Sequence, residues 1–564
     1  MKRILSMRGM KQLLLLLPFY FFTLLPITAQ PSWTKKAGKA VFTLKTFDDN
    51  GTMLSSANGV FVSPQGEALS CYTPFKGAAR AVVIDADGKE HAVQYLLGAS
   101  EMYDVAKFKV EIKKVATLPV AAKGVAQGEQ TWMLSYRTQK APISGVVRKA
   151  ETFAEEYDYY TVSMPVNEVL EGSPLCDAQG QVVGLMQRQA VQGDTLQYAV
   201  SARFADSLRI TGLSINDPAL KATSIKKDLP QKLDQAVLSL YFGASVLDSA
   251  TYATLISDFI ERFPTAPDGY QYRAQQVFAY GDYAVAQQDM EHAIQLSSHK
   301  DEPHFIYSRM IFQKETLPKS TPYEPWSLDV ALQEVRQAIA LNELPGYKQH
   351  EAHILFAMKQ YQQASDIYVD LVQTKLRSAE LFYEASRCRE MLRDTVGQLA
   401  LLDSALSVFP QPLNRAAAPY LLLRAQVRMT ASRYRDAVAD LNEYEQLMTA
   451  QLTANFYHLR HQAEIGGKLY QLALNDINKA IEIEPKNDFY LSEKASLQVR
   501  VGLYEEAKAT AHELIALAPN QSDGYLFLGL SQCLAGQREE GLQQLQKALD
   551  MGDTQAAELM DRFK

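Results

Sequence analysis

The chain has few of the residues that build a disulfide scaffold, a zinc site or a nucleic-acid-binding surface. Four cysteines in 564 residues are too few for a disulfide scaffold, and no two of them form a Cys-x-x-Cys pair. The net charge is −7, whereas a phosphate-binding surface needs clustered lysine and arginine. These absences predict no nucleic-acid partner, no metal and no cofactor.

Long apolar runs are also absent, except near the start of the chain. A basic stretch precedes an apolar run at 13–27, which Pro18 and Pro26 interrupt, and Ala29 offers a small residue for cleavage. The run is shorter than the roughly 20 residues of a membrane-spanning helix. We therefore expect residues 1–29 to be a signal peptide. The mature protein, with no transmembrane segment, would be exported to the periplasm or outer membrane, or secreted.

Residues 33–212 contain short β-rich runs separated by Gly, Asp and Asn turns, which is typical of an all-β barrel or sandwich. Residues 59–66 (GVFVSPQG) are similar to the Gly-Phe-Val-Ile-Ser-x-x-Gly segment of HtrA-like proteases, and residues 171–175 (EGSPL) resemble their nucleophile loop. Further matching segments follow the same order along the chain: 68–78, 97–110 and 198–201. The resemblance implies a trypsin-like double barrel.

The same resemblance assigns the three catalytic positions of the family to residues of this chain. The aspartate is kept as Asp104, but the histidine position holds Thr73 and the serine position holds Glu171. A serine nucleophile needs a base within hydrogen-bond reach. Between residues 30 and 210 the single histidine is His91, in a segment that the family uses as a surface hairpin. The resemblance therefore implies a pseudoprotease with no catalytic residues.

Several roles remain open for the residues around these positions. We expect Asp104 to be a capping or turn residue, and Glu171 either to point at the former oxyanion hole or to be solvated. Cys71 and Cys176 lie near the two changed positions, so they are either buried free thiols, the favoured alternative, or a disulfide in an oxidising compartment. An unorthodox hydrolase would use Ser173, Cys71 or Cys176 as its nucleophile.

From about residue 230 the pattern becomes helical and repeats. Ala473, Ala507 and Gly541 are 34 residues apart, and so are Pro485 and Pro519. A helix pair with small contact residues, an aromatic in the turn and a closing proline is the tetratricopeptide (TPR) signature. We expect a linker at 213–230, a divergent helical hairpin at 231–266, and about eight repeats at 267–564. The expected small residues of the second helices are Ala286, Ala331, Ala364, Gly397, Ala437, Ala473, Ala507 and Gly541.

Stacked TPR units form a superhelical solenoid with a concave groove, which the family uses to bind peptides or protein partners. Four aromatics on first helices are candidates for the groove, although such residues more often belong to the core: Tyr270, Tyr457, Phe489 and Tyr525.

The sequence as a whole predicts an all-β double barrel followed by an all-α TPR solenoid. The favoured function is an exported, non-enzymatic interaction scaffold. One alternative is an active peptidase with an unorthodox catalytic site. Another is a chaperone-like envelope-assembly factor that holds an extended chain by strand addition.

Overall fold

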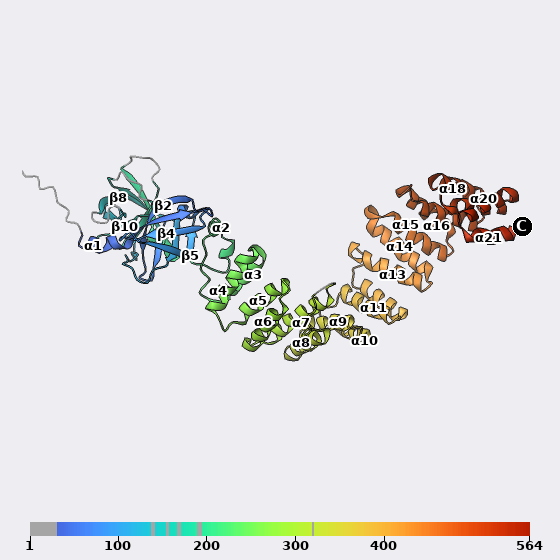
Figure 1. Cartoon of the computed structure of the whole chain (residues 1–564), viewed down its shortest axis with the longest axis horizontal. Helices are drawn as coiled ribbons and strands as arrows, with labels where there is room; N and C mark the ends of the chain where they lie inside the picture. The colour runs from blue at the N-terminus through green and yellow to red at the C-terminus, as the bar shows by residue number, and fades with distance from the viewer. Residues whose placement is uncertain are drawn as a thin grey trace, which may run out of the picture. The chain divides into compact units, whose positions relative to one another are not determined.

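The computed structural model describes residues 31–136, 142–153, 157–165, 171–188, 195–318 and 321–563 (Figure 1). The chain forms two compact units, Met1–Gln276 and Val277–Lys564. The expected signal peptide lies outside the described residues. Within the described ranges, none of the helices combines the length and the apolar composition of a membrane span.

In the first unit, the described strands form two closed six-stranded barrels, with all neighbouring strands antiparallel. The strand order is β1-β2-β3-β6-β5-β4 in the first barrel and β10-β11-β12-β9-β8-β7 in the second. This confirms the predicted double barrel. The strands are β1 (Val41–Phe47), β2 (Met53–Phe61), β3 (Glu67–Ser70), β4 (Arg80–Ile84), β5 (Glu90–Ser100), β6 (Val105–Val110), β7 (Gln130–Met133), β8 (Ile143–Phe153), β9 (Tyr157–Ser163), β10 (Pro174–Cys176), β11 (Val182–Met186) and β12 (Leu196–Ser201).

Alternating apolar residues fill each barrel and also join the two. Phe42 on β1 meets Phe61 on β2 with ring centroids 4.7 Å apart, because both side chains point into the first barrel. A second buried cluster contains Leu69 of the first barrel together with Leu185 and Val200 of the second. The barrels therefore share a core, which fixes the loops between them.

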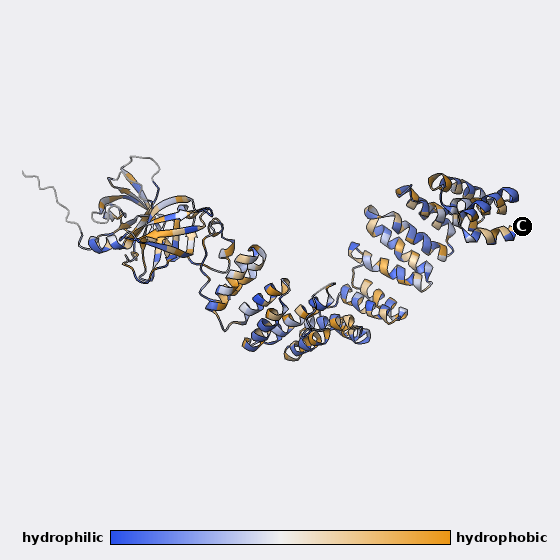
Figure 2. Cartoon of the chain, in the orientation of Figure 1, coloured by the Kyte–Doolittle hydropathy of each residue, from blue (hydrophilic) through white to orange (hydrophobic). Residues whose placement is uncertain are grey.

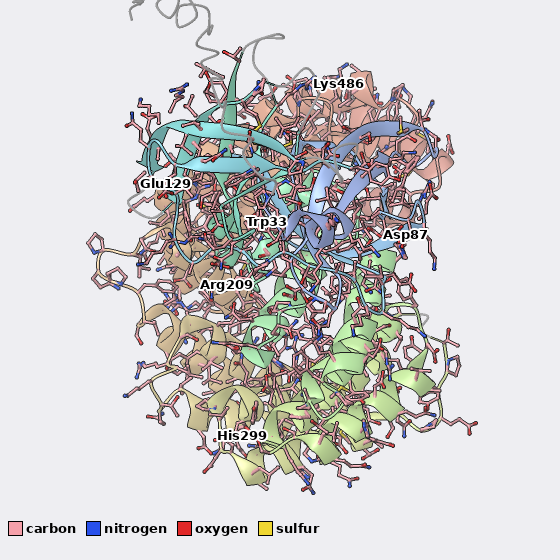
Figure 3. All side chains as sticks on the ribbon, turned by 90° about the vertical axis from the view of Figure 1, so that its left-hand side faces the viewer. Trp33, Asp87, Glu129, Arg209, His299 and Lys486 are labelled. Carbon is pink, nitrogen blue, oxygen red and sulfur yellow. The ribbon has the colours of Figure 1, made fainter. Side chains whose placement is uncertain are left out.

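The N-terminal segment is fastened to the second barrel by a tryptophan. Trp33, labelled in Figure 3, precedes α1 (Thr34–Ala37), and its indole N–H donates to the carbonyl of Ala178 at 2.9 Å. Its ring meets that of Trp132 edge-on at 6.4 Å. This contact ties α1 to strands that lie more than a hundred residues later in the chain.

Residues 213–230, the expected linker, pack against the first barrel. They contain η4 (Ser214–Asn216) and α2 (Pro218–Lys221), and Leu220 and Ile225 are buried in the core of that barrel. The hydroxyl of Tyr72 donates to the carbonyl of Ala219 at 2.8 Å. The segment is therefore part of the packed first unit.

Helix pairs follow, and Figure 2 shows hydrophobic and hydrophilic residues alternating along them. This arrangement confirms the predicted all-α solenoid. The helices are α3 (Leu233–Val246), α4 (Ser249–Arg262), α5 (Pro267–Ala279), α6 (Tyr283–Leu296), α7 (Asp301–Thr316), α8 (Leu328–Leu341), α9 (Pro345–Ala357), α10 (Tyr361–Leu371), α11 (Ala379–Met391), α12 (Thr395–Leu406), α13 (Ala418–Thr430), α14 (Tyr434–Met448), α15 (Ala454–Gly466), α16 (Tyr470–Ile483), α17 (Asp488–Arg500), α18 (Tyr504–Leu517), α19 (Ser522–Leu534), α20 (Arg538–Asp550) and α21 (Thr554–Phe563).

Small residues allow the helices of a pair to approach closely. The expected second-helix alanines are fully buried, and the backbone of Gly541 comes so close to Gly529 that a Cβ on Gly529 would lie 2.7 Å from the Gly541 carbonyl oxygen. Gly397, in contrast, is only partly buried. From the α9–α10 pair onward, the turn between the two helices of each pair contains one residue with positive φ, such as Lys468 at 58° and Gly502 at 79°.

Two arginines, Arg460 buried and Arg424 partly buried, make equivalent contacts one repeat apart. Arg424 on α13 binds Asp440 on α14 at 2.6 Å and Asp403 on α12, also at 2.6 Å. Arg460 on α15 binds Asp476 on α16 at 2.5 Å and Glu445 on α14 at 2.6 Å. Each arginine therefore joins the second helix of its own repeat to the second helix of the preceding repeat.

We predict that Arg460→Met lowers the free energy of unfolding of the helical unit by about 3–5 kcal/mol, because it leaves the buried carboxylate of Asp476 without its main partner. Chemical denaturation followed by far-UV circular dichroism measures the change. The matched control is Arg433→Met, which removes an exposed pair with Asp436 (side chains 51% and 48% exposed). This control should cost less than about 0.5 kcal/mol. Equal losses for the two variants would contradict the prediction.

Candidate functional site

The candidate site lies where loops of the two barrels meet. Thr73 begins the short helix η2 (Thr73–Phe75) after β3, Asp104 precedes β6, and Glu171 precedes β10. The Thr73 N–H donates to the Asp104 carboxylate at 2.6 Å. Cys71, two residues before Thr73, joins them, since one ligand atom each of Cys71, Asp104 and Glu171 lies within 4.8 Å of the others. The three positions implied by the resemblance are therefore neighbours in space.

The loop that carries Glu171 is fixed by its backbone. The N–H of Asn58 on β2 donates to the carbonyl of Glu171 at 2.8 Å, and the N–H of Gly172 donates to the carbonyl of Met186 on β11, also at 2.8 Å. Gly172 has φ 80°, and a Cβ there would lie 2.1 Å from the Asn58 carbonyl oxygen. Only glycine fits this position, because any side chain would meet both strain and a clash.

Asp104 and Glu171 differ in their surroundings. Asp104 has φ 48° and accepts the N–H at the start of η2, which is the turn and capping geometry expected for it. The Glu171 side chain is 8% exposed, so it is buried rather than solvated. Burial raises the pKa of Glu171, the Asp104 carboxylate raises it further, and Arg188 acts in the opposite direction.

The two cysteines of the first unit are free and buried, so they form no disulfide with each other. The Cys71 thiol donates weakly to the carbonyl of Met186 at 3.5 Å. Burial raises its pKa well above the usual range, and the carboxylates of Asp104 and Glu171 raise it further. Cys176 lies in the core shared by the barrels, and burial raises its pKa as well.

Ser173 and His91 provide no nucleophile–base pair. The Ser173 side chain is fully buried, and its Oγ makes no hydrogen bond with the described residues. His91 lies on β5, where its Nε2 contacts the Asp85 carboxylate at 2.7 Å. It lines a hollow at the turn between β4 and β5 together with Lys109 and Lys113.

The four aromatics proposed for the TPR groove have different environments. Tyr457 is partly buried, and the ammonium nitrogen of Lys479 lies over its ring, 4.8 Å from the ring centroid. Tyr525 packs partly buried against the C-terminal apolar cluster, and Tyr270, also partly buried, donates its hydroxyl to the Pro264 carbonyl at 3.0 Å. Phe489 on α17 is 50% exposed, so among these four it is the residue most available to a partner.

Comparisons with known proteins agree with this architecture. Residues 57–185 match the family model of the trypsin-like peptidase domain. A TPR-containing relative also matches, as predicted from the sequence: small glutamine-rich tetratricopeptide repeat-containing protein 2 of Saccharomyces cerevisiae is 32% identical over 98 residues, which are 17% of this chain and 28% of that protein. The chain thus spans less than a third of that relative's length.

Two solved proteases are similar to the chain in structure. The active form of the Rv3671c protease from M. tuberculosis has 18% identity and a TM-score of 0.29, covering 36% of this chain and 86% of the protease. The HtrA-type protease AlgW, solved with a decapeptide, has 18% identity and a TM-score of 0.27, covering 33% of this chain and 66% of AlgW.

We predict that Glu171→Gln stabilises the protein above acidic pH. Because folding raises the pKa of Glu171, the wild type loses stability as pH rises from the usual glutamate pKa to the raised value, and a neutral glutamine avoids this loss. In chelator-containing buffer, the melting temperature of the variant should exceed that of the wild type by a few degrees at neutral pH and match it at acidic pH.

The control is Glu101→Gln, which removes an exposed carboxylate paired with Lys76. It should change the melting temperature little at any pH, because exposed ion pairs contribute little. A Glu171→Gln variant that melts below the wild type at neutral pH would show that the Glu171 carboxylate stabilises the fold.

Proposed function

We propose that the protein is an exported scaffold for protein interactions, in which a trypsin-fold domain has lost peptide-bond cleavage and the TPR array binds protein or peptide partners. The observation that carries the proposal is the placement of Thr73 and Glu171. These residues occupy the positions where the protease family has its base and its nucleophile, and they adjoin the retained Asp104.

The three alternative nucleophiles considered from the sequence, Ser173, Cys71 and Cys176, all have unsuitable surroundings. The nucleophilic form of cysteine is the thiolate, which requires a cationic or basic neighbour. Cys71 instead faces the carboxylates of Asp104 and Glu171, which oppose its ionisation. Ser173 and Cys176 are fully buried, so a substrate cannot reach them without opening the core.

The features that keep the loop in place are independent of catalysis. Gly172 and the carbonyl of Glu171 hold the loop through backbone contacts with Asn58 and Met186. Such contacts persist when the side chain at position 171 changes. The barrel architecture is therefore compatible with loss of the catalytic groups, and it favours a retained scaffold.

The interaction role is supported by the repeat architecture and by the likeness to a TPR-containing protein. Binding through the array fits the exposed Phe489, which lies on the first helix of its repeat and meets the ring of His458 at 5.1 Å. Strand addition to the barrels is less well supported, because both described sheets are closed and closed barrels lack free edges. Export rests on the expected signal peptide at residues 1–29.

We expect the purified protein to cleave neither casein nor unstructured peptides. Fluorophosphonate and thiol-reactive activity probes should not label Ser173, Cys71 or Cys176 in the native protein, because burial and nearby negative charge suppress these nucleophiles. Heat-treated protein is the control, in which the thiols become accessible to the thiol probe. The pseudoprotease proposal would be contradicted if the wild type cleaved either substrate and this cleavage disappeared in Ser173→Ala or in Cys71→Ala.

We expect Phe489→Ala in the full chain to reduce capture of the main partner from an envelope extract by at least tenfold, because loss of a central aromatic contact typically costs about 2 kcal/mol or more. The matched control is Tyr241→Ala, another exposed aromatic, located on α3. It should leave capture unchanged. If both variants capture the partner as well as the wild type does, the surface around Phe489 is not the binding site.

A further inference from the structure

Three potential metal ligands converge from separate segments of the first unit. Cys71 follows β3, Asp104 lies between β5 and β6, and Glu171 precedes β10. Their ligand atoms all lie within 4.8 Å of one another. We propose that Cys71, Asp104 and Glu171 bind a divalent metal ion of the zinc class. The inference is independent of the proposed function, because the ion would bind whether or not the domain cleaves peptides.

The spacing suits a small tetrahedral ion. Zinc binds cysteine sulfur at about 2.3 Å and carboxylate oxygen at about 2.0–2.2 Å, which puts neighbouring ligand atoms roughly 3.5 Å apart. The observed limit of 4.8 Å is wider by about one ångström, a difference that rotation about the side-chain bonds of Glu171 can close. Three protein ligands leave a fourth position for water, consistent with the partial exposure of Asp104.

The Glu171 carboxylate gives a second reason to expect a cation. Glu171 is 8% exposed, and the Asp104 carboxylate beside it adds a second negative charge that Arg188 offsets only in part. Buried charges in proteins are normally paired or coordinate a metal. A divalent ion would add positive charge where the Glu171 and Asp104 carboxylates and the Cys71 sulfur come together.

The ligands are also held in place before any ion binds. The N–H of Thr73 fixes one oxygen of Asp104 at 2.6 Å, and the N–H of Asn58 fixes the backbone of Glu171 at 2.8 Å. The soft thiolate separates this set from the all-oxygen sites of magnesium and calcium, so zinc, cobalt or cadmium fits better. Binding would release the thiol proton, so affinity should increase with pH.

The test uses tag-free, reduced, full-length protein from which metals have been removed with a chelator. Zn²⁺ binding is measured by calorimetry, and Co²⁺ serves as a spectroscopic probe, because a cobalt–thiolate bond gives a sulfur-to-metal charge-transfer band. We expect one ion per chain, with a charge-transfer band that Zn²⁺ displaces. Cys71→Ser should abolish the band, and Asp104→Asn and Glu171→Gln should each weaken binding by at least tenfold.

Cys176→Ser is the matched control, since it alters a buried thiol of the same unit outside the cluster. It should keep the band and the affinity. The proposal is overturned if no stoichiometric binding occurs, or if the band survives in Cys71→Ser. It is equally overturned if Glu171→Gln binds as tightly as the wild type. Since Glu171→Gln is expected to fold at least as well as the wild type, its result remains decisive if Cys71→Ser misfolds.

Discussion

The carbonyl of Asn58 and the backbone of Gly172 approach each other so closely that no side chain fits between them. This approach joins β2 of the first barrel to the loop before β10 of the second, and the core shared by Leu69 and Leu185 lies beside it. The position of Glu171 in the candidate site depends on this junction, since Cys71, Thr73 and Asp104 all belong to the first barrel. The junction places Glu171 beside Asp104 and Cys71 without requiring any particular side chain at position 171.

Because this junction is made by the backbone, the trypsin-like barrels can keep their fold while the side chains at the candidate site differ from those of a protease. In this chain the groups that meet are two carboxylates and a thiol; the carboxylates disfavour ionisation of the Cys71 thiol, and Asp104 disfavours ionisation of Glu171. Such a cluster can be relieved either by holding protons or by binding a cation. Both solutions differ chemically from a serine–histidine pair, which requires a base to take up a proton during attack.

Much of the fold was predictable from the sequence, because strand alternation and the 34-residue period are local signals. The packing of residues 213–230 was not, since Leu220 and Ile225 have no regular spacing and look like parts of a polar connector. The resemblance placed Asp104 and Glu171 near each other. The sequence also placed Cys71 near the changed positions, but its contact with both carboxylates depends on the direction of the chain after β3, which no spacing reveals. Which aromatics stay exposed depends on packing between neighbouring helices, so Phe489 could not be told from Tyr457.

The two arginines that join neighbouring repeats, Arg424 and Arg460, affect which repeats of the solenoid open together. Arg424 and Arg460 occupy the seventh positions of α13 and α15, where α17 has Lys494. Nearest-neighbour coupling governs cooperativity in repeat arrays. The repeats bridged by these arginines should therefore open as one block in native-state hydrogen exchange. Past α16, where Lys494 makes no such bridge among the described residues, the terminal repeats should exchange earlier, as a separate and less protected foldon.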